Sequence, residues 1–327
     1  MKVVITDYKD VLERDLEYEK EILTKGLKNV EIVIYEYNGD KNEFLEVVKD
    51  ADAILTAFLD INKTVINACK KLKCISINAV GYDCIDLEAA TKNNIGVCAI
   101  GEYCTQEVAE HTMSLILSLS RGIKHYISDI DERKIWKYQT INNLKRIEGQ
   151  TLAVFGFGKI GRAVVKRALA FGMKVVAVDP YVKAEEAEKL GITLVDADYV
   201  WENADIISNH MNQNHSNNHF FTINEFRKMK KKPIFINAGR GSSVNEDDLL
   251  EAINENLLRG AGLDVLDAEN PDLEKCKLVG RENVIITPHA AFYSETSMKE
   301  LQRISCENIV YYLNNEKDKV NIIVNEI

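Results

Sequence analysis

Residues 151–179 constrain the fold of this chain more than any other stretch. Leu152 to Phe155 is a short apolar run that fits a buried parallel strand, and a G-x-G-x-x-G turn, Gly156-Phe157-Gly158-Lys159-Ile160-Gly161, follows it directly. Apolar residues then recur at helical spacing from Ala163 to Phe171, and a second buried strand, Lys174 to Val178, ends on Asp179. Strand, glycine turn, helix, strand and acid in this order predict a dinucleotide-binding unit.

Each of the three glycines of the G-x-G-x-x-G turn has a separate expected role. Gly156 permits the tight turn, Gly158 lets the pyrophosphate approach the backbone, and Gly161 lets the helix pack closely on the strand. The N-terminus of the helix offers N–H groups and a positive dipole end to the phosphates. A carboxylate at Asp179 can accept both ribose hydroxyls of NAD and would repel the extra phosphate of NADP. The alternative is an ordinary turn residue, since Pro180 follows; we expect NAD as the cofactor.

The composition excludes several classes of protein. The 327 residues are enough for two domains, and a net charge of −10 argues against a nucleic-acid partner. Seven cysteines, without a C-x-x-C pair, fit free thiols in the cytoplasm. No signal peptide opens the chain and no apolar run is long enough to span a bilayer, so we expect no membrane partner.

Strand and helix signals alternate along the chain, which predicts an α/β fold with two doubly wound parallel sheets. We expect one unit in residues 1–101 and a second from 151 to about 292. Residues 121–148 are polar and read as a linker or as an arm that packs on another subunit. The expected strands are Val3–Thr6, Glu31–Tyr35, Ala53–Thr56, Cys74–Asn78, Val97–Ile100, Ile206–Ser208, Ile234–Asn237, Gly260–Val265 and Val284–Thr287. The other expected helices are Leu12–Leu23, Lys41–Val48, Lys63–Lys70, Leu87–Asn93, Gln106–Leu119 and Glu295–Leu313. The last of these leaves the second unit after its final strand, and we expect it to return to the first unit.

Three charged or titratable residues follow strands of the second unit, namely Arg240, Glu269 and His289. Ligands of open parallel sheets bind outside the carboxyl ends of the strands. Reduction of a keto acid needs a cation that holds the carboxylate or polarises the carbonyl, and a guanidinium does so with paired hydrogen bonds. It also needs a proton donor, and an imidazolium oriented by a carboxylate can be one. Taken singly, each residue is more often an ordinary surface or loop residue, and spacing alone does not bring the three together.

Six motifs are spread over essentially the whole chain: NAVGYD at 78–83, VAEHTMSLILSL at 108–119, residues 154–179, NAGRGSSV at 237–244, GAGLDVLDAENP at 260–271 and TPHAAFYSE at 287–295. With these motifs the sequence resembles the D-isomer-specific 2-hydroxyacid dehydrogenases. Within the family, residues 210–221 and the segment PHAAFYSE look most like the C-terminal-binding-protein branch and its bacterial relatives.

The resemblance implies a Rossmann NAD domain, residues 102–292, and a flavodoxin-like, discontinuous substrate-binding domain, residues 1–101 and 293–327, around a cleft. It implies a homodimer, with residues 121–148 as part of the dimerisation arm. It further implies the site residues. The catalytic set is Arg240, Glu269 and His289; the cofactor-binding residues are Gly156, Gly158, Lys159, Ile160, Gly161, Asp179, His210, Ala238 and Asp264; and the substrate-binding residues are Val80, Gly81, Tyr82 and Phe292.

Two departures from the family bear on the substrate. Phosphoglycerate-type members usually have arginines near the positions of Ala57 and Ile77, so an unphosphorylated 2-oxo acid is expected. Four aromatic residues then favour an apolar or aromatic side chain on the substrate, namely Phe58, Tyr82, Phe292 and Tyr293. Plain core packing is an even alternative for each of them.

Two alternatives stay open at this point. The corepressor resemblance allows an NAD(H)-sensing binding protein with residual dehydrogenase activity. His210, His215 and His219 suggest a metal site, but no Cys or carboxylate completes it, so we expect no metal.

Overall fold

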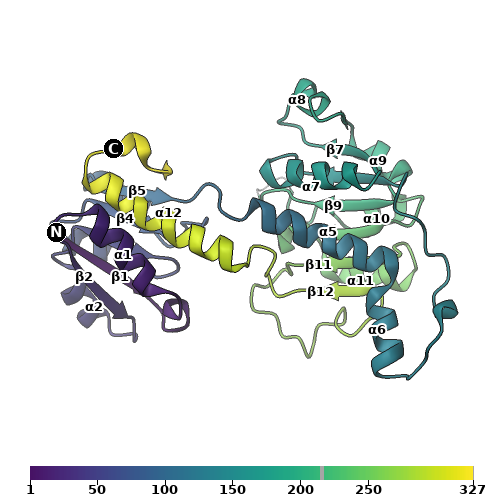
Figure 1. Cartoon of the computed structure of the whole chain (residues 1–327), viewed down its shortest axis with the longest axis horizontal. Coiled ribbons are helices and arrows are strands. Elements are labelled where there is room, and N and C mark those ends of the chain that lie inside the picture. Colours follow the sequence, from purple (N-terminus) through teal and green to yellow (C-terminus); the bar gives the residue numbers. More distant parts are fainter. Residues whose placement is uncertain (214–216, 327) are drawn as a thin grey trace. The chain divides into compact units, whose positions relative to one another are not determined.

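The computed structural model describes residues 1–213 and 217–326. The chain divides into two compact units: unit 1 comprises Met1–Tyr103 and Ser294–Ile327, and unit 2 comprises Cys104–Tyr293. Figure 1 shows the elements of each unit. None of the helices in the described part of the chain combines the length and the apolar character that crossing a bilayer requires.

Unit 1 is built on a sheet with the strand order β13-β5-β4-β3-β1-β2. Its first five strands pair in parallel and β13 is antiparallel to β5, so the order of the parallel strands is the flavodoxin-like 2-1-3-4-5. The strands are β1 (Lys2–Asp7), β2 (Glu31–Glu36), β3 (Ala53–Thr56), β4 (Cys74–Ile77), β5 (Gly96–Ala99) and β13 (Ile322–Ile323). The helices are α1 (Leu16–Gly26), α2 (Lys41–Val48), α3 (Lys63–Ala68), α4 (Leu87–Lys92) and α12 (Glu295–Leu313).

Unit 2 is built on a sheet with the order β12-β11-β10-β9-β6-β7-β8, in which all pairs are parallel. Counted from β6, this is the Rossmann order 3-2-1-4-5-6 with one added strand. The strands are β6 (Thr151–Phe155), β7 (Lys174–Val178), β8 (Thr193–Leu194), β9 (Ile206–Asn209), β10 (Ile234–Asn237), β11 (Gly260–Leu263) and β12 (Val284–Ile286). The helices are α5 (Thr105–Arg121), α6 (Ile123–Asp131), α7 (Lys159–Ala170), α8 (Ala184–Glu188), α9 (Ala197–Asn203), α10 (Ile223–Lys228) and α11 (Glu246–Asn254).

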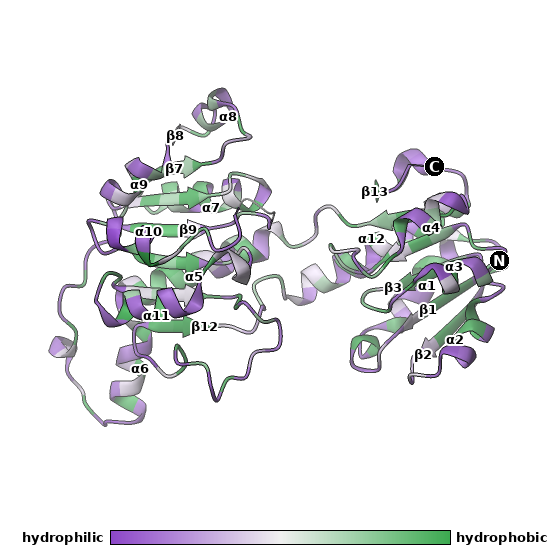
Figure 2. Cartoon of the chain, turned by 180° about the vertical axis from the view of Figure 1, so that it is seen from behind, coloured by the Kyte–Doolittle hydropathy of each residue, from purple (hydrophilic) through white to green (hydrophobic). Residues whose placement is uncertain are grey.

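The cores lie on both faces of each sheet, as a doubly wound fold requires. In unit 2, one core joins α5 and α7 to the sheet, and a second, which contains Phe155, Phe221 and Phe235, joins it to α9, α10 and α11. The strands accordingly appear mostly green in the hydropathy view, whereas the outward faces of the surrounding helices are purple (Figure 2). The predicted fold class, two doubly wound α/β units, is therefore confirmed.

Several predicted boundaries were wrong for local reasons. The first helix begins at Leu16 instead of Leu12, because the Asp15 side chain accepts a hydrogen bond from the Tyr18 N–H at 3.1 Å and caps the helix there. The helix after the glycine turn runs from Lys159 to Ala170, and the apolar spacing that predicts it covers Ala163 to Phe171. The segment 121–148 contains the helix α6, which was not predicted. The strand β13 was missed as well; it is only two residues long.

Candidate active site

The glycine turn after β6 shows three different surroundings for its three glycines. Gly156 has φ of +86°, and a Cβ there would lie 2.7 Å from the carbonyl carbon of His210. A Cβ on Gly161 would lie 2.1 Å from the carbonyl oxygen of Gly156, so this glycine is needed for packing within the turn. A Cβ on Gly158 would meet no atom within 4 Å. The open space at Gly158, at the N-terminus of α7, fits the approach of a pyrophosphate.

Asp179 lies at the end of β7, beside the same turn. One carboxylate oxygen accepts the N–H of Phe157 at 2.8 Å, and the other accepts the N–H of Tyr181 at 2.9 Å. The side chain is therefore both a turn residue and a brace of the glycine turn, and each oxygen retains a lone pair for a further donor. A half-buried, acceptor-only carboxylate at this strand end suits ribose hydroxyls.

His210 follows β9, on the other side of the topological switch point between β6 and β9. Its Nε2 lies 2.8 Å from the Ser208 hydroxyl, and its buried Nδ1 has no hydrogen-bond partner among the described residues. Burial lowers the pKa of His210 to about 4, so the ring is neutral at physiological pH. His219 lies in a different turn, and His215 lies outside the described residues. In the described part of the chain, no three His, Cys, Asp or Glu side chains are grouped to hold a metal.

Arg240 lies directly after β10 on a loop that a buried polar network holds. The Asn237 side chain donates to the Arg240 carbonyl at 3.0 Å, and the Ser243 hydroxyl donates to the same carbonyl at 2.6 Å. Asn209 on β9 donates to both of these side chains, at 3.0 Å and 2.7 Å. Among the described residues, no carboxylate forms an ion pair with the exposed Arg240 guanidinium, whose one intramolecular bond goes to the Gly239 carbonyl at 2.9 Å. An anion can therefore bind there without displacing a protein partner.

His289 and Glu269 form a pair at the carboxyl edge of the same sheet. The Nδ1 atom of His289 lies 2.8 Å from a carboxylate oxygen of Glu269. The His289 side chain is 39% exposed, and its ring packs edge-on against Phe292 with centroids 6.0 Å apart. With Nδ1 engaged by the carboxylate, Nε2 is the nitrogen left to face a substrate. The prediction that these two side chains meet, which spacing alone did not establish, matches this geometry.

The backbone of His289 is in the left-handed region, with φ of +49°. This conformation costs a non-glycine residue about 1–2 kcal/mol, so neighbouring interactions must hold it. The buried Asp264 does so: its carbonyl accepts the His289 N–H at 2.8 Å, and its carboxylate accepts the Ala290 and Ala291 N–H groups at 2.9 and 3.0 Å. Asp264 was predicted as a cofactor residue; the contacts described here all organise the loop that carries His289.

The other predicted residues divide between the units. Ala238 is half-buried, and its N–H donates to the Asn209 carbonyl at 3.2 Å. Lys159 is exposed and Ile160 half-buried in the first turn of α7. In unit 1, Val80, Gly81 and Tyr82 are exposed after β4.

Unit 1 has an organised loop at its own switch point, between β1 and β3. The buried Asp7 carboxylate accepts the Thr56 hydroxyl at 3.0 Å and the N–H groups of Ala57 and Phe58 at 2.5 and 3.1 Å. The Phe58 side chain, held on this loop, is 62% exposed. Sequence reasoning missed Asp7, together with Asn209, Asn237 and Ser243, because each acts through hydrogen bonds that only the fold reveals.

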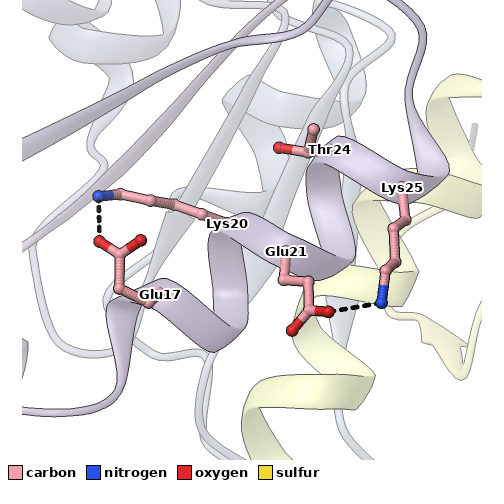
Figure 3. Close-up of a pocket in the computed structure, with 5 residues that line it drawn as sticks. All are labelled: Glu17, Lys20, Glu21, Thr24 and Lys25. Atoms are coloured by element: carbon pink, nitrogen blue, oxygen red, sulfur yellow. Dashed lines mark hydrogen bonds and ion pairs between the residues drawn. The ribbon is translucent and has the colours of Figure 1, made fainter.

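A surface groove lies along α1, lined by Glu17, Lys20, Glu21, Thr24 and Lys25 (Figure 3). Its charges are paired along the helix, Glu17 with Lys20 at 2.6 Å and Glu21 with Lys25 at 2.5 Å. It contains none of the predicted site residues, and its self-paired charges offer no built site for a ligand.

Comparison with known proteins identifies the family. Residues 113–291 match the model of the D-isomer specific 2-hydroxyacid dehydrogenase, NAD binding domain. The D-3-phosphoglycerate dehydrogenase of Methanocaldococcus jannaschii is 36% identical over 84% of this chain, which spans only 52% of that relative. The hydroxypyruvate reductase of Thermotoga maritima is 32% identical over 83% of this chain and 88% of its own length.

Solved structures agree with this relationship. A D-lactate dehydrogenase from Aquifex aeolicus, complexed with NAD and lactic acid, superposes with a TM-score of 0.82 at 27% identity and covers 99% of both chains. The resemblance to the dehydrogenase family and the prediction of NAD as cofactor are confirmed. The C-terminal-binding-protein branch is not singled out, and the comparisons lend no support to a corepressor function.

Proposed function

The chain belongs to the D-isomer-specific 2-hydroxyacid dehydrogenases, which are NAD-dependent oxidoreductases, and we propose that it reduces an unphosphorylated 2-oxo acid with an apolar or aromatic side chain to the D-2-hydroxy acid. The observation that carries this proposal is the His289–Glu269 pair at 2.8 Å, on the same sheet edge as an Arg240 without an acidic partner among the described residues. This set supplies a proton donor and an anion-binding group.

In the proposed mechanism, NAD supplies the hydride chemistry and the protein residues supply binding and proton transfer. The Arg240 guanidinium holds the substrate carboxylate or polarises the carbonyl with paired hydrogen bonds. His289 gives the Nε2 proton to the developing alkoxide. Glu269 accepts the Nδ1 proton of His289, so it fixes the orientation of the ring and leaves Nε2 to face the substrate.

Cofactor binding in the proposal falls to the residues around the glycine turn. The open space at Gly158 suits the pyrophosphate, with Lys159, Ile160 and Gly161 forming the first turn of α7 beneath it. Asp179 would accept the ribose hydroxyls, and the neutral His210, Ala238 and Asp264 would line the neighbouring strand ends.

Unit 1 supports the proposed substrate class. Phe58, Val80 and Tyr82 are 62%, 46% and 37% exposed at the carboxyl ends of its strands, where they offer apolar and aromatic contacts. Ala57 and Ile77 are uncharged and buried, so neither side chain offers a cation to a substrate phosphate. In unit 2, Phe292 adds an aromatic ring beside His289. The backbone of Val80 and Gly81 is the proposed partner of the substrate carboxylate.

The test is a panel of 2-oxo acids assayed with NADH and NADPH side by side. We expect turnover of phenylpyruvate and 2-oxoisocaproate with NADH above that of pyruvate and 3-phosphohydroxypyruvate. Faster turnover of the phosphorylated acid would overturn the substrate class. Absence of turnover on the whole panel by protein that binds NADH would overturn the enzymatic proposal.

We also infer a homodimer, formed through the arm 121–148. Ile123, Ile127 and Ile130 are 44%, 54% and 42% exposed on one face of α6, and Trp136 is 90% exposed beyond it. The arm is held on the rest of unit 2, because the Lys124 ammonium donates to the Arg281 and Val284 carbonyls at 2.7 and 2.6 Å. An ordered apolar stripe of this kind is typical of an interface between subunits.

A cytoplasmic location is the last part of the proposal. All seven cysteines are free, and Cys69, Cys74, Cys98 and Cys306 are buried. Buried thiols in this number suit a reducing compartment. Thiol titration of protein isolated without reductant and then unfolded should find seven thiols per chain; a lower value, restored by reductant, would contradict the proposed location.

A further inference from the structure

A chain of side chains links the helix α5 to the loop that carries His289. The Nε2 atom of His111, on α5, lies 2.9 Å from the Thr287 hydroxyl oxygen, although 176 residues separate them in the sequence. The same hydroxyl donates to a carboxylate oxygen of Asp264 at 2.6 Å. His111 and Thr287 are not among the predicted site residues, and the proposed mechanism does not use them.

The hydrogen positions in this chain follow from the groups involved. An ionised carboxylate only accepts, so the single hydroxyl proton of Thr287 goes to Asp264. The Thr287 oxygen must then accept from His111, which requires a proton on the His111 Nε2 atom. That atom also lies 3.5 Å from the same Asp264 oxygen. Each member therefore restricts the orientation of the next.

The far end of this chain is the strained backbone of His289. Asp264 is 2% exposed, and its carboxylate accepts the Ala290 and Ala291 N–H groups while its carbonyl accepts that of His289. These contacts hold the left-handed φ of +49° at His289. A rotation of the Asp264 carboxylate would release two of the three N–H groups. Whatever fixes the carboxylate thus also fixes the backbone from which the His289 side chain extends.

We propose that His111 and Thr287 are positioning residues for the reaction, which lock the Asp264 carboxylate and thereby hold the His289 loop in the orientation for proton transfer. This inference rests on the proposed role of His289. The two residues hold the carboxylate that organises the His289 loop, and Asp264 itself stays in place beside the proposed cofactor site. Their loss therefore lowers kcat far more than it lowers the affinity for NADH.

Paired substitutions test this proposal. Thr287→Val and His111→Phe keep the shape and remove the hydrogen bonds, whereas Thr287→Ser and His111→Gln keep a hydroxyl or a donor near the same place. We expect the first pair to lower kcat by roughly 10- to 100-fold with the NADH Kd changed less than about threefold, and the second pair to recover most of the activity. Ser114→Ala, which removes an exposed hydroxyl from the same helix, is the matched control.

Amide hydrogen exchange supplies a readout that does not depend on activity. Exchange at His289, Ala290 and Ala291 should accelerate at least roughly tenfold in Thr287→Val and His111→Phe, while the core of β6 keeps its protection. Unchanged kcat and unchanged exchange in these two variants, with turnover abolished by His289→Asn, would overturn the positioning role alone. Full activity in His289→Asn would instead overturn the proposed function. Equal losses of kcat, stability and NADH binding in all four variants would reduce both residues to a general structural role.

Discussion

At the residue scale, the most informative position is His289, where a left-handed backbone and a side-chain pair coincide. We expect His289→Asn to lower kcat by roughly 10²- to 10⁴-fold, because the proton donor is lost. Asparagine tolerates a positive φ and can still donate from its amide to Glu269, so the loop should keep its conformation. Steady-state kinetics and NADH titration separate the two effects; a comparable loss of NADH affinity would argue against a role confined to proton transfer.

His210 gives a prediction on pH and stability. Its pKa is lowered by burial from 6.5 to about 4 in the folded chain. Between pH 6.5 and pH 4 the His210 ring binds a proton in the unfolded chain but not in the folded chain. The free energy of unfolding therefore has its full value above pH 6.5 and decreases as the pH falls toward 4. The loss is at most roughly 3 kcal/mol, since the residue retains some accessible surface. Urea unfolding at pH 7.5 and pH 5 should show a smaller change in the free energy of unfolding for His210→Gln than for the wild type. An equal change in both proteins would contradict the lowered pKa of His210.

At the element scale, the sequence predicted strands well where a short, continuous apolar run marked them. The continuous apolar runs at Ala53–Thr56 and Ile234–Asn237 are buried strands with the predicted bounds. The start of α1 and the helix α6 were missed for physical reasons. Asp15 ends a turn and caps α1, so the helix begins after it. The isoleucines of α6 are exposed, so this helix lacks the buried apolar face by which a helix is predicted from sequence.

The glycine turn allows a matched prediction at the same scale. Gly158→Ala should leave the melting temperature unchanged and weaken NADH binding by at least roughly tenfold, since its Cβ enters only the space proposed for the pyrophosphate. Gly161→Ala should instead destabilise unit 2 by roughly 1–3 kcal/mol, because its Cβ would overlap the Gly156 carbonyl oxygen. Thermal melts and NADH titrations of both variants are the measurement. The roles assigned to the two glycines would be wrong if Gly158→Ala lowered the melting temperature and Gly161→Ala lowered only the affinity for NADH.

At the scale of the whole molecule, the two doubly wound α/β units were predictable because alternation of strand and helix leaves few solutions. The Rossmann and flavodoxin-like topologies were implied only by the family resemblance. The candidate site was predictable only in its charged members. Arg240, Glu269 and His289 have evident chemistry, and their place after parallel strands predicts the shared edge. Asn209, Asn237 and Thr287 have no such signal, because a neutral polar side chain gains its role from partners distant in sequence.

The apolar stripe on α6 gives the last prediction, which concerns the assembly. The chain has a mass of 37.0 kDa, and light scattering should find about twice that value for a homodimer. Ile127→Asp places a charge in the centre of the stripe and should shift the particle to the monomer mass, because an unpaired buried charge costs several kcal/mol at an interface. Leu273→Asp is the matched control, since Leu273 is 55% exposed and Ile127 is 54% exposed, but Leu273 lies outside the arm. A dimer that persists in Ile127→Asp, or one that only Leu273→Asp disrupts, would place the interface elsewhere on the chain.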